Sequence, residues 1–154
     1  MSAPAEAQLP APWRIVERRQ DTADVFTWVV APLGDAGIAC APGQFNMVYA
    51  HGIGEVPISI AGVAGDGTLQ HTIRAVGSVT RALAGLGAGT VIGLRGAYGS
   101  AWPLEAAAGG DLVIVAGGLG LAPLRQAVVE VLAERSRYGR VCILYGTRTP
   151  ADVL

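Results

Sequence analysis

Residues 113–123 have the sequence Val-Ile-Val-Ala-Gly-Gly-Leu-Gly-Leu-Ala-Pro. The apolar run from Leu112 to Ala116 is rich in β-branched residues and predicts a buried strand. Three glycines follow, and a helix is expected to open at Pro123. Such a turn exposes backbone N–H groups at a helix N-terminus, where the helix dipole favours an anion. The run therefore predicts a phosphate-binding turn. A tight turn without a ligand is the alternative, because the G-x-G-x-x-G pattern is absent.

The residues after this turn predict one βαβ unit. Between Pro123 and Arg135, apolar residues recur at helical spacing and form one stripe: Leu124, Ala127, Val128, Val131 and Leu132. Four polar residues are expected to face away from that stripe: Arg125, Gln126, Glu130 and Glu134. Residues 141–145 predict the next buried strand. A doubly wound domain needs more strands than two, so we expect a truncated product or completion by another polypeptide, with an unpaired apolar edge.

The first hundred residues have a different pattern. Short β-forming runs are separated by glycine- and proline-containing turns, and they predict strands over 13–19, 25–30, 44–50, 57–63, 69–76 and 90–94. A short helix is expected over 78–83, a loop over 51–55 and a turn over 95–99. Six evenly spaced strands favour a closed antiparallel barrel. The expected fold class is therefore an all-β, six-stranded antiparallel barrel followed by the first βαβ unit of an incomplete α/β nucleotide-binding domain.

Composition limits the classes of function. Of the 154 residues, 51% are hydrophobic and 15% charged, and the net charge is −1, which argues against binding to nucleic acid or an anionic membrane. Glycines interrupt the longest apolar stretch, and the N-terminus lacks a signal-peptide pattern, so we expect no membrane span and a cytoplasmic location. Cys40 and Cys142 are far apart in the sequence and predict two free thiols with no metal site.

Four short motifs occur in a fixed order along the chain: Pro57-Ile-Ser59, Gly77-Ser-Val-Thr80, Gly96-Ala-Tyr-Gly99 and the glycine turn ending at Pro123. In this combination the chain resembles the ferredoxin–NADP reductase superfamily over residues 13–154. It looks most like the electron-transfer branch, which includes the gamma subunit of cytoplasmic NiFe hydrogenase (sulfhydrogenase). The branch also includes the dihydroorotate dehydrogenase electron-transfer subunit and the corresponding subunit of anaerobic sulfite reductase. Residues 1–12 are rich in alanine and proline and predict a loose N-terminal tail. The resemblance implies a flavin-binding barrel (13–103) and a partial NAD(P)-binding domain (104–154).

The resemblance also implies the flavin-binding residues. Ser59 matches the catalytic hydroxyl residue beside flavin N5, and Ile58 matches the side chain packed on the isoalloxazine. Val56 stands where the family has an arginine that binds the FAD pyrophosphate; FAD is expected, FMN is an alternative, and Arg74 is the residue that compensates. The Gly-x-x-Thr motif matches a phosphate loop in which Val79 and Thr80 offer amides and a hydroxyl. The implied set is Val56, Pro57, Ile58, Ser59, Thr72, Ile73, Arg74, Gly77, Ser78, Val79 and Thr80.

A second implied set binds the dinucleotide NAD(P)H. The glycine turn would hold its pyrophosphate, and the residues after the next strand lie at the carboxyl end of the sheet, where ligands bind in open α/β folds. This set is Gly117, Gly118, Gly120, Leu121, Ala122, Pro123, Gly146, Thr147 and Arg148.

The implied reaction is hydride transfer between NAD(P)H and flavin N5, followed by electron transfer to a hydrogenase-like or sulfite-reductase-like partner subunit. It needs no acid–base residue, because the cofactors carry the chemistry. The family's iron–sulfur cluster follows the nucleotide domain and is not expected in this chain. Two alternatives remain open: a non-catalytic docking module with a decayed flavin site, and a stand-alone NAD(P)H:flavin or ferric reductase. His51 and His71 are expected to have no catalytic role.

Overall fold

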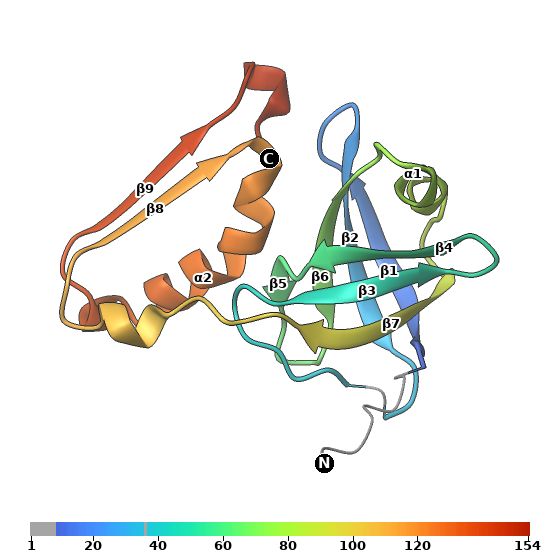
Figure 1. Cartoon of the computed structure of the whole chain (residues 1–154), viewed down its shortest axis with the longest axis horizontal. Coiled ribbons are helices and arrows are strands. Elements are labelled where there is room, and N and C mark those ends of the chain that lie inside the picture. The colour runs from blue at the N-terminus through green and yellow to red at the C-terminus, as the bar shows by residue number, and fades with distance from the viewer. Residues whose placement is uncertain (1–8, 36) are drawn as a thin grey trace, which may run out of the picture.

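The structure is a computed structural model that describes residues 9–35 and 37–154. Two parts are visible in Figure 1: a β-sheet folded on itself and a smaller unit around a single long helix. Most of the expected N-terminal tail lies outside the described residues. Seven antiparallel strands make the larger sheet: β1 (Ala11–Gln20), β2 (Val25–Pro32), β3 (Phe45–Ala50), β4 (Gly54–Ser59), β5 (Gly62–Val63), β6 (Leu69–Arg74) and β7 (Val91–Tyr98). Their order is β4-β3-β7-β1-β2-β6-β5.

Two residues close this sheet into a barrel. β4 and β5 stand at opposite ends of the strand order, yet only Ile60 and Ala61 separate them in the chain. The Ile60 amide donates to the carbonyl of Gln44, beside β3, at 3.0 Å, and the Ala61 amide donates to Gln70, in β6, at 2.8 Å. At this point the chain stops pairing beside β3 and begins to pair with β6. The expected antiparallel barrel is confirmed, and its predicted strand over 57–63 is divided between the two edges.

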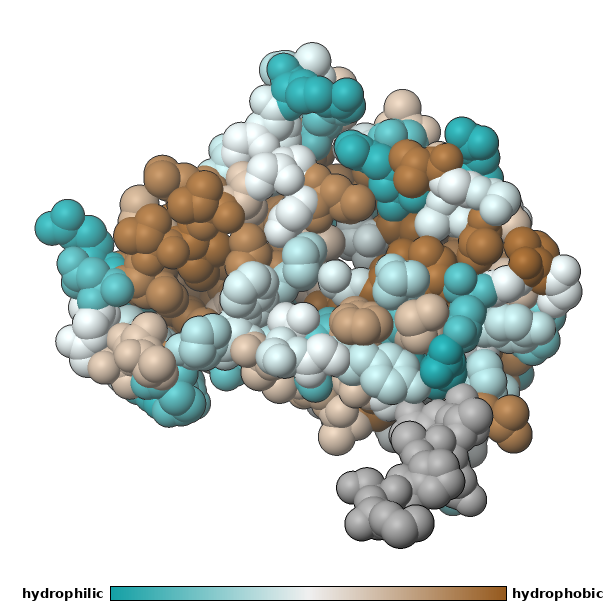
Figure 2. All heavy atoms as spheres, viewed as in Figure 1, coloured by the Kyte–Doolittle hydropathy of each residue, from teal (hydrophilic) through white to brown (hydrophobic). Residues whose placement is uncertain are grey.

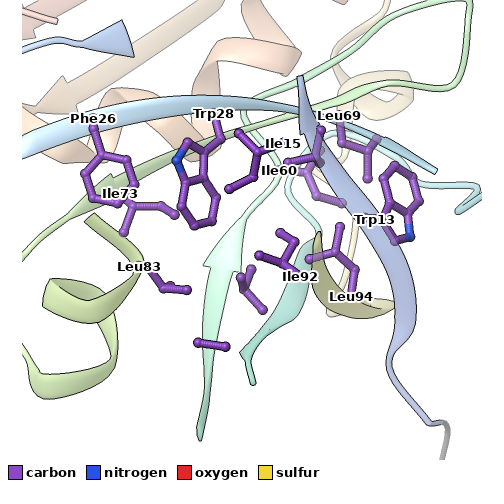
Figure 3. Close-up of a cluster of buried hydrophobic side chains, with 13 residues drawn as sticks. Trp13, Ile15, Phe26, Trp28, Ile60, Leu69, Ile73, Leu83, Ile92 and Leu94 are labelled. Atoms are coloured by element: carbon purple, nitrogen blue, oxygen red, sulfur yellow. The ribbon is translucent and has the colours of Figure 1, made fainter. Parts of the chain in front are cut away.

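The barrel core consists of the inward side chains of the strands (Figure 3). Alternate residues of β1, β2, β6 and β7 point inward, and helix α1 (Ser78–Ala84) adds Leu83 from one end of the barrel. The largest buried apolar side chains are Trp13, Ile15, Phe26, Trp28, Ile60, Leu69, Ile73, Leu83, Ile92 and Leu94. Two tryptophans and a phenylalanine account for much of the buried area, because aromatic side chains each bury a large apolar surface.

Two strand boundaries differ from the sequence-based expectation. The expected turn over 95–99 is strand: β7 continues to Tyr98, and Arg95 pairs with Met47 of β3. Gly96 has φ of +136°, so this glycine marks an irregular position within the strand and not a turn. The expected loop over 51–55 is shorter, because Gly54 already pairs with Ala50 and leaves only a three-residue connection. Glycine was therefore a poor guide to strand ends in this barrel.

The second part is the βαβ unit that the sequence predicts. Strands β8 (Leu112–Gly117) and β9 (Val141–Gly146) are parallel, and helix α2 (Leu121–Ala133) connects them. Four short 3-10 segments flank these elements: η1 (Leu104–Ala107), η2 (Gly118–Gly120), η3 (Arg135–Arg137) and η4 (Pro150–Asp152). α2 starts two residues before Pro123, which the first helical turn tolerates because its N–H groups lack intrahelical partners.

The described residues leave much of the β8–β9 sheet uncovered. Ala127 and Val131 of α2 are buried against Leu104 and Tyr138. On β8 and β9, four apolar side chains are 42–66% exposed: Val113, Val115, Ile143 and Leu144. Figure 2 shows apolar side chains gathered over these strands. The expected unpaired apolar surface is present, whereas the expectation that 141–145 is buried is wrong, because α2, Leu104 and Tyr138 pack near Leu112 and Val141 and leave Ile143 and Leu144 exposed.

The orientation of α2 also differs from the expectation. Leu132, assigned to the buried stripe, is 55% exposed. Arg125 and Gln126, assigned to the solvent face, hydrogen-bond to the barrel. The prediction of a buried stripe is confirmed at Ala127 and Val131. The polar residues expected to face solvent differ because the helix packs against both the sheet and the barrel. Within the described residues, no helix is long and apolar enough to span a membrane.

Candidate functional site

A pocket lies between the barrel and the start of α2, and we name it the barrel pocket. Its volume is about 420 Å³, within the usual size of ligand sites. The end of β4, the end of β6 and the first turn of α2 supply most of its lining. The lining residues are Pro57, Ile58, Ser59, Thr72, Ile73, Arg74, Val76, Thr80, Leu119, Gly120, Ala122 and Pro123. The structure therefore brings together most of the implied flavin-binding residues and three of the implied NAD(P)-binding residues.

A second pocket, here the glycine-loop pocket, adjoins the first. It measures about 500 Å³ and opens at the carboxyl ends of β8 and β9. Its lining residues are Arg74, Gly117, Gly118, Leu119, Gly120, Gly146, Thr147, Arg148 and Asp152. Arg74, Leu119 and Gly120 belong to both pockets. The two sites implied separately by the sequence therefore meet, and Arg74 lies where they meet.

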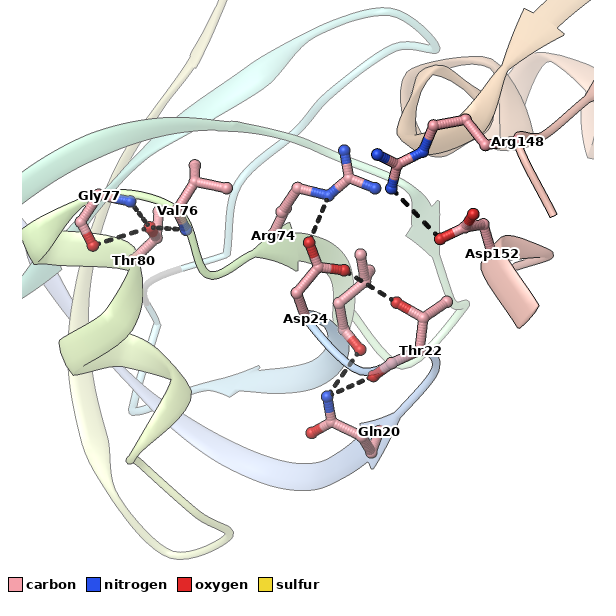
Figure 4. Close-up of polar contacts among 10 residues, drawn as sticks. Gln20, Thr22, Asp24, Arg74, Val76, Gly77, Thr80, Arg148 and Asp152 are labelled. Atoms are coloured by element: carbon pink, nitrogen blue, oxygen red, sulfur yellow. Dashed lines mark hydrogen bonds and ion pairs between the residues drawn. The ribbon is translucent and has the colours of Figure 1, made fainter.

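Arginine side chains give the glycine-loop pocket its charge (Figure 4). Arg74 Nε lies 3.1 Å from Asp24 Oδ2, and Arg148 Nη2 lies 3.4 Å from Asp152 Oδ1. The hydrogen bond from the Thr149 hydroxyl, together with the charge of Arg148, lowers the pKa of Asp152 below its ordinary value. Each guanidinium is thus paired with one carboxylate, Arg74 with Asp24 and Arg148 with Asp152. A guanidinium has five N–H donors, so each can bind an anion in addition to its ion-pair partner.

The backbone of the glycine turn is open to the glycine-loop pocket. A Cβ atom added at Gly117, Gly118, Gly120 or Gly146 would have no heavy atom within 4 Å. Packing inside the protein therefore does not require these glycines, although Gly118 has φ of +48°. No side chain caps the N-terminus of α2 at Gly120. Bare backbone at an uncapped helix start provides space and N–H groups for a phosphate.

Ser59 stands at the end of β4 in the lining of the barrel pocket. Its carbonyl accepts a 3.0 Å hydrogen bond from Nδ1 of His71, which is fully buried. Burial lowers the pKa of His71 to about 4, and the bond to Ser59 offsets only part of that effect. His71 is therefore neutral near pH 7, with its proton on Nδ1, because a carbonyl can only accept. It holds the backbone of Ser59 and does not line either pocket.

Two implied flavin-binding residues differ from the expectation. Val56 packs against the barrel core and lines neither pocket. The Thr80 hydroxyl accepts from the amides of Val76 and Gly77, at 3.1 and 2.9 Å, and lies 3.2 Å from the Gly77 carbonyl. These contacts use its full hydrogen-bonding capacity. In contrast to the expectation, Thr80 shapes its own loop, and this hydroxyl is not available to a phosphate (Figure 4).

Four further implied residues line neither pocket: Gly77, Ser78, Val79 and Leu121. Conversely, sequence reasoning missed three lining residues. Val76 and Leu119 gave no signal, because a single aliphatic residue beside a glycine is not diagnostic. Asp152 gave a sequence signal, because an acidic residue four positions after Arg148 can pair with it on a helical turn. The structure contains this ion pair.

No family model matches the chain. In sequence it is 38% identical over 113 residues to the sulfhydrogenase 2 gamma subunit of Pyrococcus furiosus, covering 73% of this chain and 39% of that protein. It is 37% identical over 112 residues to the probable dihydroorotate dehydrogenase B (NAD(+)) electron transfer subunit of Archaeoglobus fulgidus, covering 73% and 43%. The chain thus spans about two fifths of the length of these relatives.

Among solved structures, the chain is similar to a ferredoxin–NADP+ reductase from Neisseria gonorrhoeae with bound FAD and NADP. The TM-score is 0.78 and the identity 22%, over 96% of this chain and 61% of that one. The fold is therefore that of the ferredoxin–NADP reductases, a barrel followed by a nucleotide-binding unit. Within this class, the sequence matches confirm the resemblance to the electron-transfer branch, represented by sulfhydrogenase gamma subunits and dihydroorotate dehydrogenase electron transfer subunits.

Proposed function

We propose that the chain binds a flavin in the barrel pocket and the pyrophosphate of NAD(P)H in the glycine-loop pocket, as part of an oxidoreductase electron-transfer subunit. The observation that carries the proposal is the junction of the two pockets at Arg74 and Gly120. Ligands in both pockets would meet there, as a hydride donor and its acceptor must. The Neisseria gonorrhoeae structure, which has this fold, contains FAD and NADP.

The residues of the barrel pocket fit a flavin. Proline and isoleucine side chains supply apolar surface for a planar ring, and Ser59 supplies a hydroxyl at the end of β4. Arg74 replaces the missing arginine at Val56 as the cationic group, since its side chain remains 30% exposed within the pocket lining. We propose FAD as the flavin and keep FMN as the alternative. When bound, a flavin accepts a hydride and releases electrons singly.

The protein's own contribution is binding and orientation. The open backbone from Gly117 to Gly120 and the start of α2 would hold the pyrophosphate, with Arg148 beside it. Asp152 holds Arg148 in place through its ion pair. Ser59 would donate its hydroxyl to the ring near the reacting atom. No acid–base pair is required, because a hydride carries its own electrons between the two cofactors.

The electron acceptor is proposed to be a partner protein. The relatives are named as subunits of a sulfhydrogenase and of dihydroorotate dehydrogenase B, so a redox-active partner subunit, hydrogenase-like or sulfite-reductase-like, is the corresponding proposal here. We also propose a cytoplasmic location for the complex.

Flavin titration with spectroscopy tests the proposed function. The purified protein should take up FAD, or FMN, with quenching of flavin fluorescence, and NADH or NADPH should bleach the bound flavin in the absence of oxygen. A protein that takes up neither flavin would contradict the proposal and favour a docking module. Fast reduction of free flavin or ferric iron without a partner would instead favour a stand-alone reductase.

Replacing Arg74 tests the junction of the two pockets. In Arg74→Ala, the dissociation constant of FAD should rise about 10- to 100-fold, because a charge-assisted hydrogen bond contributes about 1.5–3 kcal/mol. The apparent affinity for NAD(P)H should fall as well, since the same side chain lines both pockets. Fluorescence titration measures both constants.

Asp24→Asn is the matched control for this prediction. It removes the ion-pair partner of Arg74 but leaves the guanidinium in place, and this pair is partly exposed and contributes little to stability. FAD affinity close to that of the wild type is expected. An Arg74→Ala variant that binds FAD as tightly as the control would show that Arg74 does not bind the cofactor.

A further inference from the structure

Helix α2 is hydrogen-bonded to the segment that closes the barrel. Arg125 Nη1 donates to the carbonyl of Ala61 at 3.1 Å, and the amide of Val63 donates to Gln126 Oε1 at 3.1 Å. We name these two bonds the α2 clasp. Figure 1 shows α2 beside β5, the strand to which Val63 belongs. Consecutive residues of one helix thus bind both a carbonyl and an amide of one short stretch of main chain.

Both chain segments joined by the clasp lie next to the barrel pocket. Ala61 follows Ser59 by two residues, and Arg125 follows Pro123 by two residues. Ser59 and Pro123 both line the barrel pocket. The clasp therefore joins the same two chain segments that face each other across that pocket. Any movement of α2 along or away from β5 would change the distance between Ser59 and the glycine turn.

Gly62 provides the space for the clasp. A Cβ atom at this position would lie 2.9 Å from Arg125 Nη1 and 2.8 Å from Gln70 Oε1, which is too close for the present arrangement. On another side, Trp102 Nε1 donates to the carbonyl of Pro123 at 3.1 Å. The first turns of α2 are thus held by the barrel-closing segment and by the chain that leads out of β7.

We propose that Arg125 and Gln126 are positioning residues that set the separation of the flavin and the nicotinamide. This inference rests on the proposed function. Neither side chain lines the barrel pocket or the glycine-loop pocket, so each acts through the main chain it binds and not by contact with a cofactor. Hydride transfer is sensitive to such a separation, because a misplacement of about 1 Å can lower a rate about 100-fold.

Single-turnover reduction of the flavin-loaded protein at saturating NAD(P)H tests the proposal. Arg125→Ala should lower the hydride-transfer rate constant about 10- to 100-fold while the flavin dissociation constant changes by less than about threefold. Gln126→Ala should act in the same direction without any change in charge, which separates positioning from attraction of an anionic dinucleotide. Arg125→Lys keeps a donor and should recover most of the rate.

Two further variants sharpen this test. Gly62→Ala displaces the Arg125 guanidinium without removing its charge, and a smaller decrease in rate is expected. Arg135→Ala is the matched control, because Arg135 Nη1 also donates to a backbone carbonyl, that of Tyr138 at 2.9 Å, but away from both pockets. Its hydride-transfer rate should equal that of the wild type.

Hydrogen exchange of the cofactor-free protein gives a second, independent readout. Amides of residues 61–63 and 118–122 should exchange faster in Arg125→Ala and Gln126→Ala than in the wild type or in Arg135→Ala. Unchanged exchange there, or unchanged hydride transfer in an active protein, would overturn the inference. If the wild type binds no flavin, the proposed function fails, and faster exchange in the variants would show that the clasp still positions α2.

Discussion

Ser59→Ala is expected to slow hydride transfer to the bound flavin by about 100-fold. Ser59 is the serine in the lining of the barrel pocket, at the end of β4. A donor beside the atom that receives the hydride stabilises the negative charge that develops there, and removing one such donor typically costs about 10²–10³ in rate. Anaerobic stopped-flow measurement at saturating NAD(P)H, with flavin absorbance as the signal, measures this rate constant.

Thr72→Ala provides the comparison for Ser59→Ala. Thr72 also lines the barrel pocket, but its hydroxyl lies 2.8 Å from the Thr27 hydroxyl, with which it is hydrogen-bonded. Its removal should change the hydride-transfer rate by less than about threefold, since no donor near the ring is lost. Equal rates in Ser59→Ala and the wild type would place the reacting atom elsewhere, even if flavin still binds.

The parts of the fold that local patterns determine could be predicted from the sequence. The run from Leu112 to Ala116 predicts β8 because it is apolar and β-branched, and the barrel strands follow from short β-forming runs between turns. The closure at Ile60 and Ala61 could not be predicted, because it depends on which strands lie on either side of one continuous run. The pairing of the whole sheet determines where the strand changes its neighbour, and no short stretch of sequence indicates that position.

The candidate site shows the same division. The glycine turn and Ser59 belong to motifs, and the structure places them around adjoining pockets. The α2 clasp could not be predicted, because hydrophobic periodicity assigns a single buried face to a helix. α2 instead contacts both the β8–β9 sheet and the barrel. The expectation that the Thr80 hydroxyl binds a phosphate is also wrong. Whether a hydroxyl is free for a ligand depends on its other hydrogen bonds, and those become visible only in three dimensions.

The position of Val56 illustrates how a motif can match while one of its side chains does not. Alternation along β4 turns this side chain toward the barrel core, where valine is a suitable residue. Arg74, on β6, reaches the place where the two pockets meet. The structure places this residue, which the resemblance already names as the compensating cation, in the lining of both pockets.

His71 should make the protein unstable in mild acid. Its pKa is about 4 in the folded protein, against an ordinary value of 6.5. Between these values the unfolded chain binds more protons than the folded one, so stability rises with pH across this window and is lost as the pH falls. From pH 7.5 to pH 5, the free energy of unfolding should decrease by about 2 kcal/mol through this group alone.

Urea unfolding at a series of pH values tests this contribution. His71→Phe should be less stable than the wild type at pH 7.5, because the Ser59 carbonyl loses its donor, but its stability should change little down to pH 5. His51→Gln is the control: His51 is exposed, and the loss of stability in acid should persist. The carboxylates whose pKa values are lowered, such as that of Asp152, titrate mostly below this range. A wild-type protein equally stable at pH 5 and 7.5 would show that His71 is not the neutral, buried donor that holds Ser59.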